Sequence, residues 1–418
     1  MRPERIVITG IGAITPFGIG KEAFTAGVQQ GQSCVKKICT FDVDSLSSKK
    51  AAMVSDYRPE VFDGSPRFCR SAKSSQFSLV TTDMALGDAR LDKSNLPPTR
   101  TGIFLGSDHC ALESTERFYA ALIEKGPSLT NPLLFQETVS NAPASEISIR
   151  YGIKGPSYVI TSGMASSGLA ISAAIHALRD GSIDIAIAGG VDTLFRMLYQ
   201  AFSNLKQLSA GADNAEICRP FDRRRNGFIL GEGAGIIVLE TWHHAHNRDA
   251  LIQAEVIGEG MSCCHWEYNR KHRATGENGF AFAMIEAIQQ SGIQKDSIGY
   301  IAAASSGDRI LDIEEIRAIS SVFQGGKGQI IAGSIKSMIG ETTGPGSVLN
   351  LIHAVEVLKS GIIPPTLHYE RADIDLNFIV PNKTIERPLD YALINSASLT
   401  GNCSSILIKK YIAEGSHA

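Results

Sequence analysis

Serines in a turn of small residues are the first candidates for nucleophilic chemistry in this sequence. Residues 158–161 (Tyr-Val-Ile-Thr) indicate a buried strand, and residues 162–168 follow as a turn of small side chains. Ser162, Ser166 and Ser167 stand where a helix begins, and serine hydroxyls at such positions commonly cap backbone N–H groups. Capping is therefore the favoured interpretation, and a hydrolase or transferase that uses one of these hydroxyls is the alternative.

Other patterns could suggest a cofactor or a metal, but each has a simpler interpretation. Gly10 and Gly12 follow a short strand, yet the third glycine and the acidic residue of a dinucleotide fingerprint are missing, so a tight strand-to-loop turn is expected. The histidines of residues 243–246 lie on a polar connector, which favours a solvated helix face over a metal site. The eight cysteines include no Cys-x-x-Cys pair. We therefore expect reduced thiols, no disulfide framework, no metal and no bound cofactor.

Composition excludes several classes of protein. The chain has 418 residues, of which 43% are hydrophobic and 20% charged, with a formal net charge of -3. No basic stripe runs along it, so nucleic acid is not expected as a partner, and the cluster at 223–225 is expected to form a turn or structural ion pairs. No stretch approaches the roughly 20 apolar residues that span a bilayer, and the N-terminus lacks a signal-peptide core. These features predict a cytoplasmic protein.

The elements that would position these residues form an approximate internal repeat. In each half a buried strand leads to a small-residue turn and then to a helix that carries an Ile-His-Ala triplet. The strands are 158–161 and 330–332, the turns 162–168 and 338–344, and the triplets 175–177 and 352–354. Strands that alternate with glycine turns and helices indicate an α/β fold. We expect two related halves, residues 1–250 and residues 251–418.

Motifs in register along nearly the whole chain resemble those of the β-ketoacyl synthases of the thiolase-like superfamily. They are residues 8–16 (Ile-Thr-Gly-Ile-Gly-Ala-Ile-Thr-Pro), 148–157 (Ser-Ile-Arg-Tyr-Gly to Gly-Pro-Ser), 186–192 (Ala-Ile-Ala-Gly-Gly-Val-Asp), 220–235 (Pro-Phe-Asp to Gly-Glu-Gly-Ala-Gly) and 336–340 (Lys-Ser-Met-Ile-Gly). The resemblance implies a five-layered αβαβα sandwich in which buried helices separate two sheets.

The chemistry of that family needs a cysteine thiolate to hold the acyl chain and two histidines to stabilise an enolate. This sequence has other residues at all three positions: Met164, Ala304 and Glu341. A thioether cannot form a thioester, alanine offers no donor, and the Glu341 carboxylate would repel the carboxylate of a malonyl extender. The loop 396–402 also lacks the phenylalanine that gates active enzymes.

The scaffold is nevertheless present, including Glu315 and Lys336, which the resemblance implies are an ion pair. A chain that retains the scaffold motifs of the family but lacks its catalytic residues is similar to the chain-length factor, or ketosynthase β subunit, of a type II polyketide synthase. We expect no enzyme activity from the chain alone, only a role as subunit of a β-ketoacyl synthase complex. Alternatives are an aryl polyene partner subunit, a decarboxylating priming synthase, whose histidines are missing here, and a carrier or lipid-binding module.

The resemblance also implies partners. These are an active ketosynthase α subunit, joined as a heterodimer along Tyr158, Val159 and Ile160, a phosphopantetheinylated acyl carrier protein, and the growing polyketide chain. An amphipathic helix expected over 111–123 and the loop 134–138 would line the tunnel for that chain. Candidate tunnel or gate residues are Leu112, Thr115, Phe118, Tyr119, Phe135, Gln136 and Thr138. Plain core packing is the alternative for each of them.

Overall fold

The computed structural model describes residues 4–211, 216–264, 278–325 and 330–412. Its main sheet is centred on β1 (Ile6–Thr15), in which every residue is buried. Along its length β1 pairs antiparallel with β8 (Gly233–Thr241), and its first residues, Ile6–Ile8, also pair with β9 (Ala254–Cys263). This double pairing joins the strands of the two halves into one hydrogen-bonded sheet.

The sheet has eleven strands in the order β11-β10-β14-β15-β9-β1-β8-β7-β5-β6, with β2 paired to β1. The remaining strands are β2 (Gly18–Ile19), β5 (Thr101–Gly106), β6 (Ser157–Ile160), β7 (Ile185–Asp192), β10 (Tyr300–Ala302), β11 (Ile331–Gly333), β14 (Tyr391–Ala397) and β15 (Asn402–Lys410). Two small hairpins lie apart, formed by β3 (Lys36–Lys37) with β4 (Lys50–Ala51) and by β12 (Ile362–Ile363) with β13 (Ile385–Glu386).

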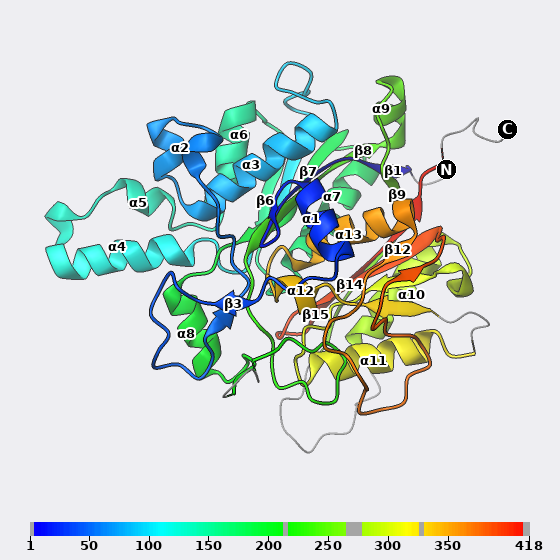
Figure 1. Cartoon of the computed structure of the whole chain (residues 1–418). Helices are drawn as coiled ribbons and strands as arrows, with labels where there is room; N and C mark the ends of the chain where they lie inside the picture. Colours follow the sequence, from blue (N-terminus) through cyan, green and yellow to red (C-terminus); the bar gives the residue numbers. More distant parts are fainter. Residues whose placement is uncertain (1–3, 212–215, 265–277, 326–329, 413–418) are drawn as a thin grey trace.

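Helices separate and cover the strands of the two halves (Figure 1). In the centre, α7 (Ser166–Arg179) packs on β5 and β7, while its neighbour α13 (Gly346–Ser360) packs on β14 and β8. On the outside, α3 (Lys73–Asp88) covers β1 and β8, whereas α10 (Gly279–Ser291) covers β9 and β15 and contacts α11 (Leu311–Val322). These are the five predicted layers, although β1 and β9 connect the two predicted sheets.

The other helices are short or peripheral. They are α1 (Lys21–Gln29), α2 (Pro66–Arg70), α4 (Leu112–Lys125), α5 (Leu133–Gln136), α6 (Ala142–Tyr151), α8 (Arg196–Asn204), α9 (Trp242–Asn247) and α12 (Lys336–Ile339). The helices α4 and α5 project from the body of the molecule as an arm (Figure 1). In the part of the chain that the structure describes, no helix is long and apolar enough to cross a membrane.

The turn predicted at Gly10 and Gly12 is wrong, because both glycines lie inside β1. A Cβ atom on Gly10 would stand 2.1 Å from the carbonyl oxygen of Ala85, and one on Gly12 would stand 2.0 Å from that of Thr81. The glycines therefore let α3 lie directly against the strand.

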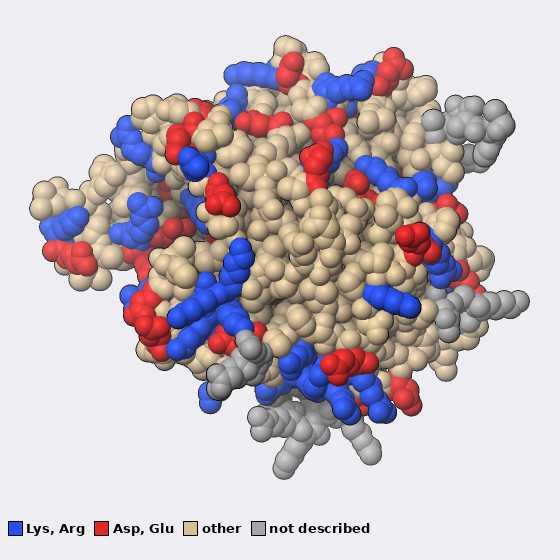
Figure 2. All heavy atoms as spheres, in the orientation of Figure 1, with Lys and Arg blue, Asp and Glu red and all other residues tan. Residues whose placement is uncertain are grey.

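The two charged clusters noted in the sequence make local structural contacts. Arg225 is buried and pairs with Asp373, and Arg224 pairs with Asp222, so the ion-pair interpretation of residues 223–225 is confirmed. In α9, the Nδ1 atom of His244 lies 2.6 Å from a carboxylate oxygen of the buried Glu240. Figure 2 shows both signs of charge interspersed around the margin of the face in view, while its centre is largely uncharged.

A buried histidine in α13 gives the chain a predictable dependence on pH. The Nε2 atom of His353 lies 3.0 Å from the hydroxyl of Tyr300, and burial lowers the pKa of His353 to about 3. The usual pKa of a histidine is about 6.5. Between this pH and about pH 3, the unfolded chain therefore binds a proton at His353 that the folded chain does not bind. The free energy of unfolding should therefore fall as the pH falls through this window.

We expect the wild-type protein to lose about 2 kcal/mol more than a His353→Gln variant between pH 6.5 and pH 5. Glutamine keeps a polar partner for Tyr300 but does not titrate. Urea unfolding at the two pH values measures the difference, and equal losses in the two proteins would show that His353 is not the titrating group.

Candidate functional site

Met164 lies in the turn between β6 and α7, with its side chain only 3% exposed. It belongs to the same hydrophobic cluster as Phe202, Phe228 and Ala304. The preceding Gly163 has a φ of 61°, and a Cβ atom there would stand 2.9 Å from the Cβ of Ser398. The turn is thus held against the loop between β14 and β15, and the adaptable thioether fills an apolar space behind it.

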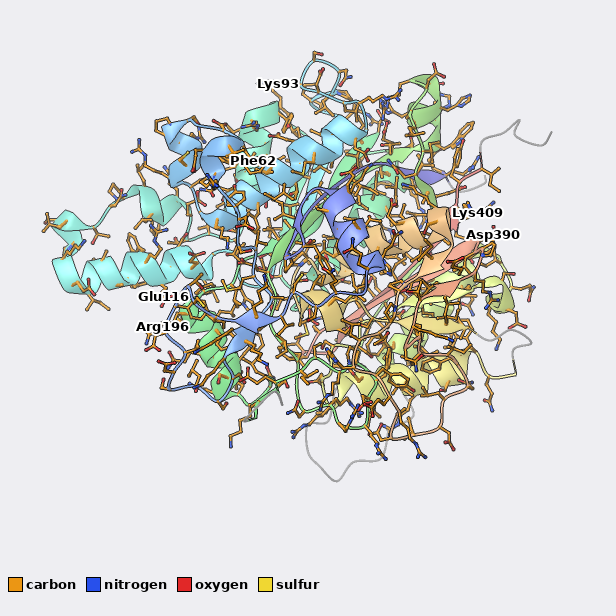
Figure 3. The ribbon with its side chains drawn as sticks, in the orientation of Figure 1. Phe62, Lys93, Glu116, Arg196, Asp390 and Lys409 are labelled. Atoms are coloured by element: carbon orange, nitrogen blue, oxygen red, sulfur yellow. The ribbon has the colours of Figure 1, made fainter. Side chains whose placement is uncertain are left out.

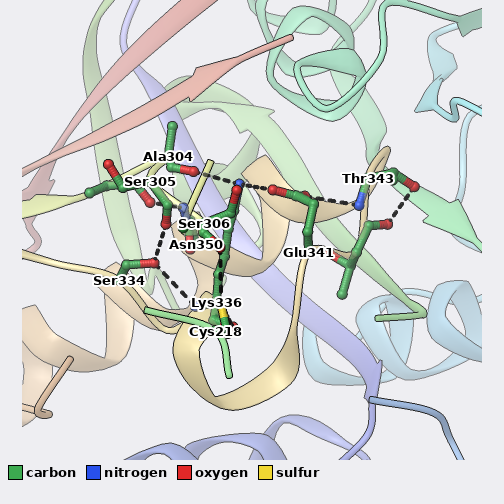
Figure 4. Close-up of polar contacts among 12 residues, drawn as sticks. Cys218, Ala304, Ser305, Ser306, Ser334, Lys336, Glu341, Thr343 and Asn350 are labelled. Carbon is green, nitrogen blue, oxygen red and sulfur yellow. Dashed lines mark hydrogen bonds and ion pairs between the residues drawn. The ribbon is translucent and has the colours of Figure 1, made fainter. Parts of the chain in front are cut away.

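Ala304 and Glu341 are joined through Lys336 in one chain of buried polar contacts (Figure 4). The Lys336 ammonium donates to the carbonyl oxygen of Ala304 at 2.8 Å and to the Glu341 carboxylate at 2.7 Å. The other oxygen of Glu341 accepts from the backbone N–H of Thr343 at 3.0 Å. Lys336 therefore joins two of the three positions identified from the sequence, and Ala304 belongs to the same hydrophobic cluster as Met164, the third.

The predicted ion pair between Lys336 and Glu315 is wrong. Glu315 instead accepts from the backbone N–H groups of Ala304 and Ser305, at 2.9 and 2.7 Å, and from the Asn395 side chain at 3.0 Å. These neutral donors satisfy the Glu315 carboxylate, whereas Glu341 follows Lys336 by one short turn. Lys336 also gives the Glu341 carboxylate a counter-charge, at 2.7 Å.

Asp192, at the end of β7, connects this turn to the strands of the first half. Its buried carboxylate accepts from Thr343 Oγ1 and from the backbone N–H of Gly344, both at 2.7 Å, and from Ser107 Oγ at 2.6 Å. Sequence reasoning included Asp192 in a motif but gave it no role. The sequence signal for such a role was an acidic residue at the end of a continuous buried strand.

Two further titratable groups near the site were missed in the sequence. His109 pairs with Asp108 at 2.8 Å, and its ring meets that of Phe202 edge-on at 5.7 Å. Burial would lower the pKa of His109, but the carboxylates of Asp108 and Asp192 raise it above its usual value. Cys218 donates to the carbonyl oxygen of Lys336 at 3.2 Å, and burial raises the pKa of its thiol.

The turn serines have structural contacts other than the predicted capping. Ser166 Oγ accepts from the backbone N–H of Ser162 at 2.9 Å and donates to the Gly163 carbonyl at 2.6 Å. Ser167 Oγ accepts from the backbone N–H of Val348, in α13, at 3.2 Å. The N-cap of α7 is Ala165, which makes no side-chain cap. These hydroxyls stabilise the turn and its contact with α13.

The candidate gate residues lie on the arm and not in the core. Leu112, Tyr119 and Phe135 are 38%, 56% and 60% exposed, and Ser114 is the only described residue of α4 that is buried. The Phe118 ring lies 5.8 Å from that of Tyr119 and 5.7 Å from that of Phe135. The alternative of plain core packing is therefore wrong for these aromatic residues in the chain alone.

The rest of the arm is held by local contacts. The Thr115 hydroxyl donates to the carbonyl oxygen of Ala111, and the Thr138 hydroxyl donates to that of Phe135. Gln136 is the last residue of α5, and this helix replaces part of the loop expected over 134–138. The arm meets the body where α4 contacts α8, near the labelled Glu116 and Arg196 (Figure 3).

The strand expected to pair with a partner forms the edge of the sheet. Within the described residues, β6 pairs only with β5, and Tyr158 is 57% exposed, while Val159 and Ile160 are half-buried. A groove of about 680 Å³ lies beside it, lined by Phe104, Ile160, Ala173 and Met261 among others. This edge remains open to a further strand.

Two family descriptions match the chain in order: "Beta-ketoacyl synthase, N-terminal domain" over residues 3–245 and "Beta-ketoacyl synthase, C-terminal domain" over residues 254–370. The chain is 31% identical to 3-oxoacyl-[acyl-carrier-protein] synthase 2 of Vibrio harveyi, over 99% of this chain and 100% of the relative.

Two solved structures share the fold over 98% of this chain and 100% of their own. One is the ishigamide ketosynthase/chain length factor, with a TM-score of 0.88 and 28% identity. The other is a type II PKS acyl-carrier protein in complex with its ketosynthase bound to the hexaketide, with a TM-score of 0.87 and 26% identity. The predicted thiolase-like fold is confirmed.

One expectation from the sequence is contradicted by the curated relatives. We expected no enzyme activity from the chain alone, because Met164, Ala304 and Glu341 replace the family's reactive groups. The relatives that match over their full length are named as synthases, which are catalytic enzymes. The three replacements remove one arrangement of a thiolate and two imidazoles, but the expectation of a non-enzyme conflicts with these relatives and is not supported.

The order of the two matched domains, the five layers and the full-length relative lead to the same conclusion. The chain belongs to the β-ketoacyl synthase family.

Proposed function

We propose that this chain is the chain-length-determining subunit of a β-ketoacyl synthase complex in type II polyketide biosynthesis. It pairs with a cysteine-containing ketosynthase along β6, and its arm shapes the tunnel that receives the growing chain. The observation that carries the proposal is the group of exposed aromatic side chains on the arm, close in sequence to an open sheet edge.

Half of the exposed large apolar side chains among the described residues lie between residues 112 and 158. Leu112, Tyr119, Ile123, Leu129, Leu133, Phe135, Val139, Ile149 and Tyr158 are all more than a third exposed. A surface of this kind marks a contact site, because single chains rarely leave contiguous apolar area in water. The aromatic members of α4 and α5 suit contact with both a protein partner and an apolar acyl chain.

The solved structures support the same assignment by their composition. One is described as a ketosynthase/chain length factor, and another contains an acyl-carrier protein in complex with its ketosynthase. By this analogy we propose that a phosphopantetheinylated acyl carrier protein delivers extender units to the complex.

Co-expression with a cysteine-containing ketosynthase from the same kind of system tests the pairing. We expect a one-to-one heterodimer by light scattering after size exclusion. Tyr158→Glu places a charge in the proposed seam and should weaken the complex by about 100-fold or more. Leu251→Glu changes a side chain that is equally exposed, at 59%, and should have no effect. A stable homodimer that ignores the ketosynthase, or equal binding by both variants, would refute the proposed pairing.

A further inference from the structure

Two cysteine thiols from different strands converge near the loop that faces Met164. Cys264 directly follows β9, and Cys403 lies in β15, which pairs antiparallel with β9. Both thiols donate to the same acceptor, the carbonyl oxygen of Gly401, at 3.6 Å each. A Cβ atom on Gly279 would stand 2.6 Å from the sulfur of Cys264 and 2.9 Å from that of Cys403.

The register explains how the two side chains meet. Cys263 stands opposite Asn402 and Ser262 opposite Cys403, so Cys264 and Cys403 are diagonal neighbours across the strand pair. The lack of a side chain at Gly279, at the start of α10, leaves room for both sulfurs on the same side.

The surroundings give the two thiols different roles. Cys264 is partly exposed, and the neighbouring Cys403 thiol lowers the pKa of the Cys264 thiol. Cys403 is fully buried, and the neighbouring Cys264 thiol, together with burial, raises the pKa of the Cys403 thiol. Since the thiolate is the form that reacts with oxidants, Cys264 is the sulfur that a small oxidant would reach first.

We infer that Cys264 and Cys403 are an oxidisable dithiol that closes to an intramolecular disulfide in the presence of a hydroperoxide. The Cys264 thiolate attacks the O–O bond of hydrogen peroxide, which gives a sulfenic acid at Cys264 and, after protonation, one water. The Cys403 sulfur then attacks the Cys264 sulfur, the S–S bond forms, and the departing hydroxide takes the Cys403 proton as a second water. The two thiols are oxidised by two electrons, and the peroxide is reduced.

The proposed bond would act on the loop next to Met164. Residues 398–401 connect β14 to β15, and the Ser398 hydroxyl accepts from the backbone N–H of Asn402 at 3.2 Å. Because Ser398 contacts the turn at Gly163, a bond from Cys403 to the end of β9 would fix the base of this loop. The inference is independent of the proposed chain-length function.

Peptide mapping of the complete chain tests the inference. Reduced protein is treated with hydrogen peroxide, quenched in acid, unfolded and alkylated. We expect a peptide pair linked through Cys264 and Cys403, smaller by the mass of two hydrogen atoms, with neither thiol alkylated, and full reversal by dithiothreitol.

The matched control is Cys263→Ser, which changes the exposed neighbour and should leave the linked peptide unchanged. In Cys264→Ser the link should disappear and Cys403 should remain fully alkylated. A second variant, Cys403→Ala, should leave Cys264 oxidised to the sulfinic or sulfonic acid. Two outcomes would overturn the inference. One is a disulfide through Cys263, and the other is wild-type protein in which Cys264 is oxidised while Cys403 is still alkylated.

Discussion

Replacement of Lys336 by methionine should lower the free energy of unfolding by about 3–5 kcal/mol, measured by urea unfolding at pH 7. The Lys336 and Glu341 side chains are 5% and 0% exposed, and their charged atoms lie 2.7 Å apart. The Lys336→Met variant would leave the Glu341 carboxylate buried without a counter-charge and the carbonyl of Ala304 without its donor. Loss of one partner of a buried pair costs far more than the pair itself contributes.

The controls separate the buried charge from the lost side chain. The double variant Lys336→Met/Glu341→Gln removes both charges and should recover most of the lost stability. Arg67→Met breaks a pair of similar length, 2.9 Å to Glu146, but at the surface, and should cost less than about 1 kcal/mol. If Lys336→Met and Arg67→Met unfold at the same urea concentration, Lys336 and Glu341 do not form a buried ion pair.

The architecture could be predicted because its signals are local and repeated. Strands such as β8 are continuous apolar runs, and α13 is buried on almost every side, as expected for a central helix. The role of Gly10 and Gly12 could not be predicted. A glycine that makes a turn and a glycine that admits a helix give the same local pattern, and the atoms that decide between them belong to Thr81 and Ala85.

The candidate site was predictable in its positions but not in its contacts. Met164, Ala304 and Glu341 could be located because each lies at a fixed place within a motif. The partner of Lys336 depends on which carboxylate is already satisfied, and the backbone donors that occupy Glu315 are set by the loop after β10. His109 was missed because a single histidine after a strand carries no spacing pattern.

The arm shows what amphipathic spacing can and cannot predict. The expected helix, residues 111–123, agrees closely with α4. Its apolar face was open to two interpretations, because periodicity shows that a face is apolar but not what covers it. In the isolated chain Phe118 contacts the rings of Tyr119 and Phe135. No layer of the main body covers Tyr119 or Phe135, which are both exposed. A partner protein or a bound acyl chain is therefore the remaining candidate to cover this apolar face.

Phe118→Ala, studied in the complex with an active ketosynthase, should shift the products toward longer polyketides. Phe118 is the central ring of the arm's aromatic group, and its removal would open space at the proposed end of the tunnel. Because the side chain is only partly buried in the chain alone, the variant should cost less than about 1–2 kcal/mol of stability, well below a core truncation. The readout is mass spectrometry of the products made by the reconstituted complex.

The matched control is Ile123→Ala, in the last turns of the same helix, where the side chain is 82% exposed and belongs to none of the ring contacts. It removes apolar surface from α4 without opening the aromatic group, so the product length should stay that of the wild type. Leu112→Ala, at the first residue of α4, should lengthen the products as Phe118→Ala does, because both variants shorten apolar side chains of the helix that we propose lines the tunnel. Heterodimer formation is checked first by size exclusion, so that a change in product length is not confused with loss of the complex. If intact complexes with Phe118→Ala and Leu112→Ala made the wild-type product at the wild-type rate, the arm would serve association alone and another part of the chain would set the length.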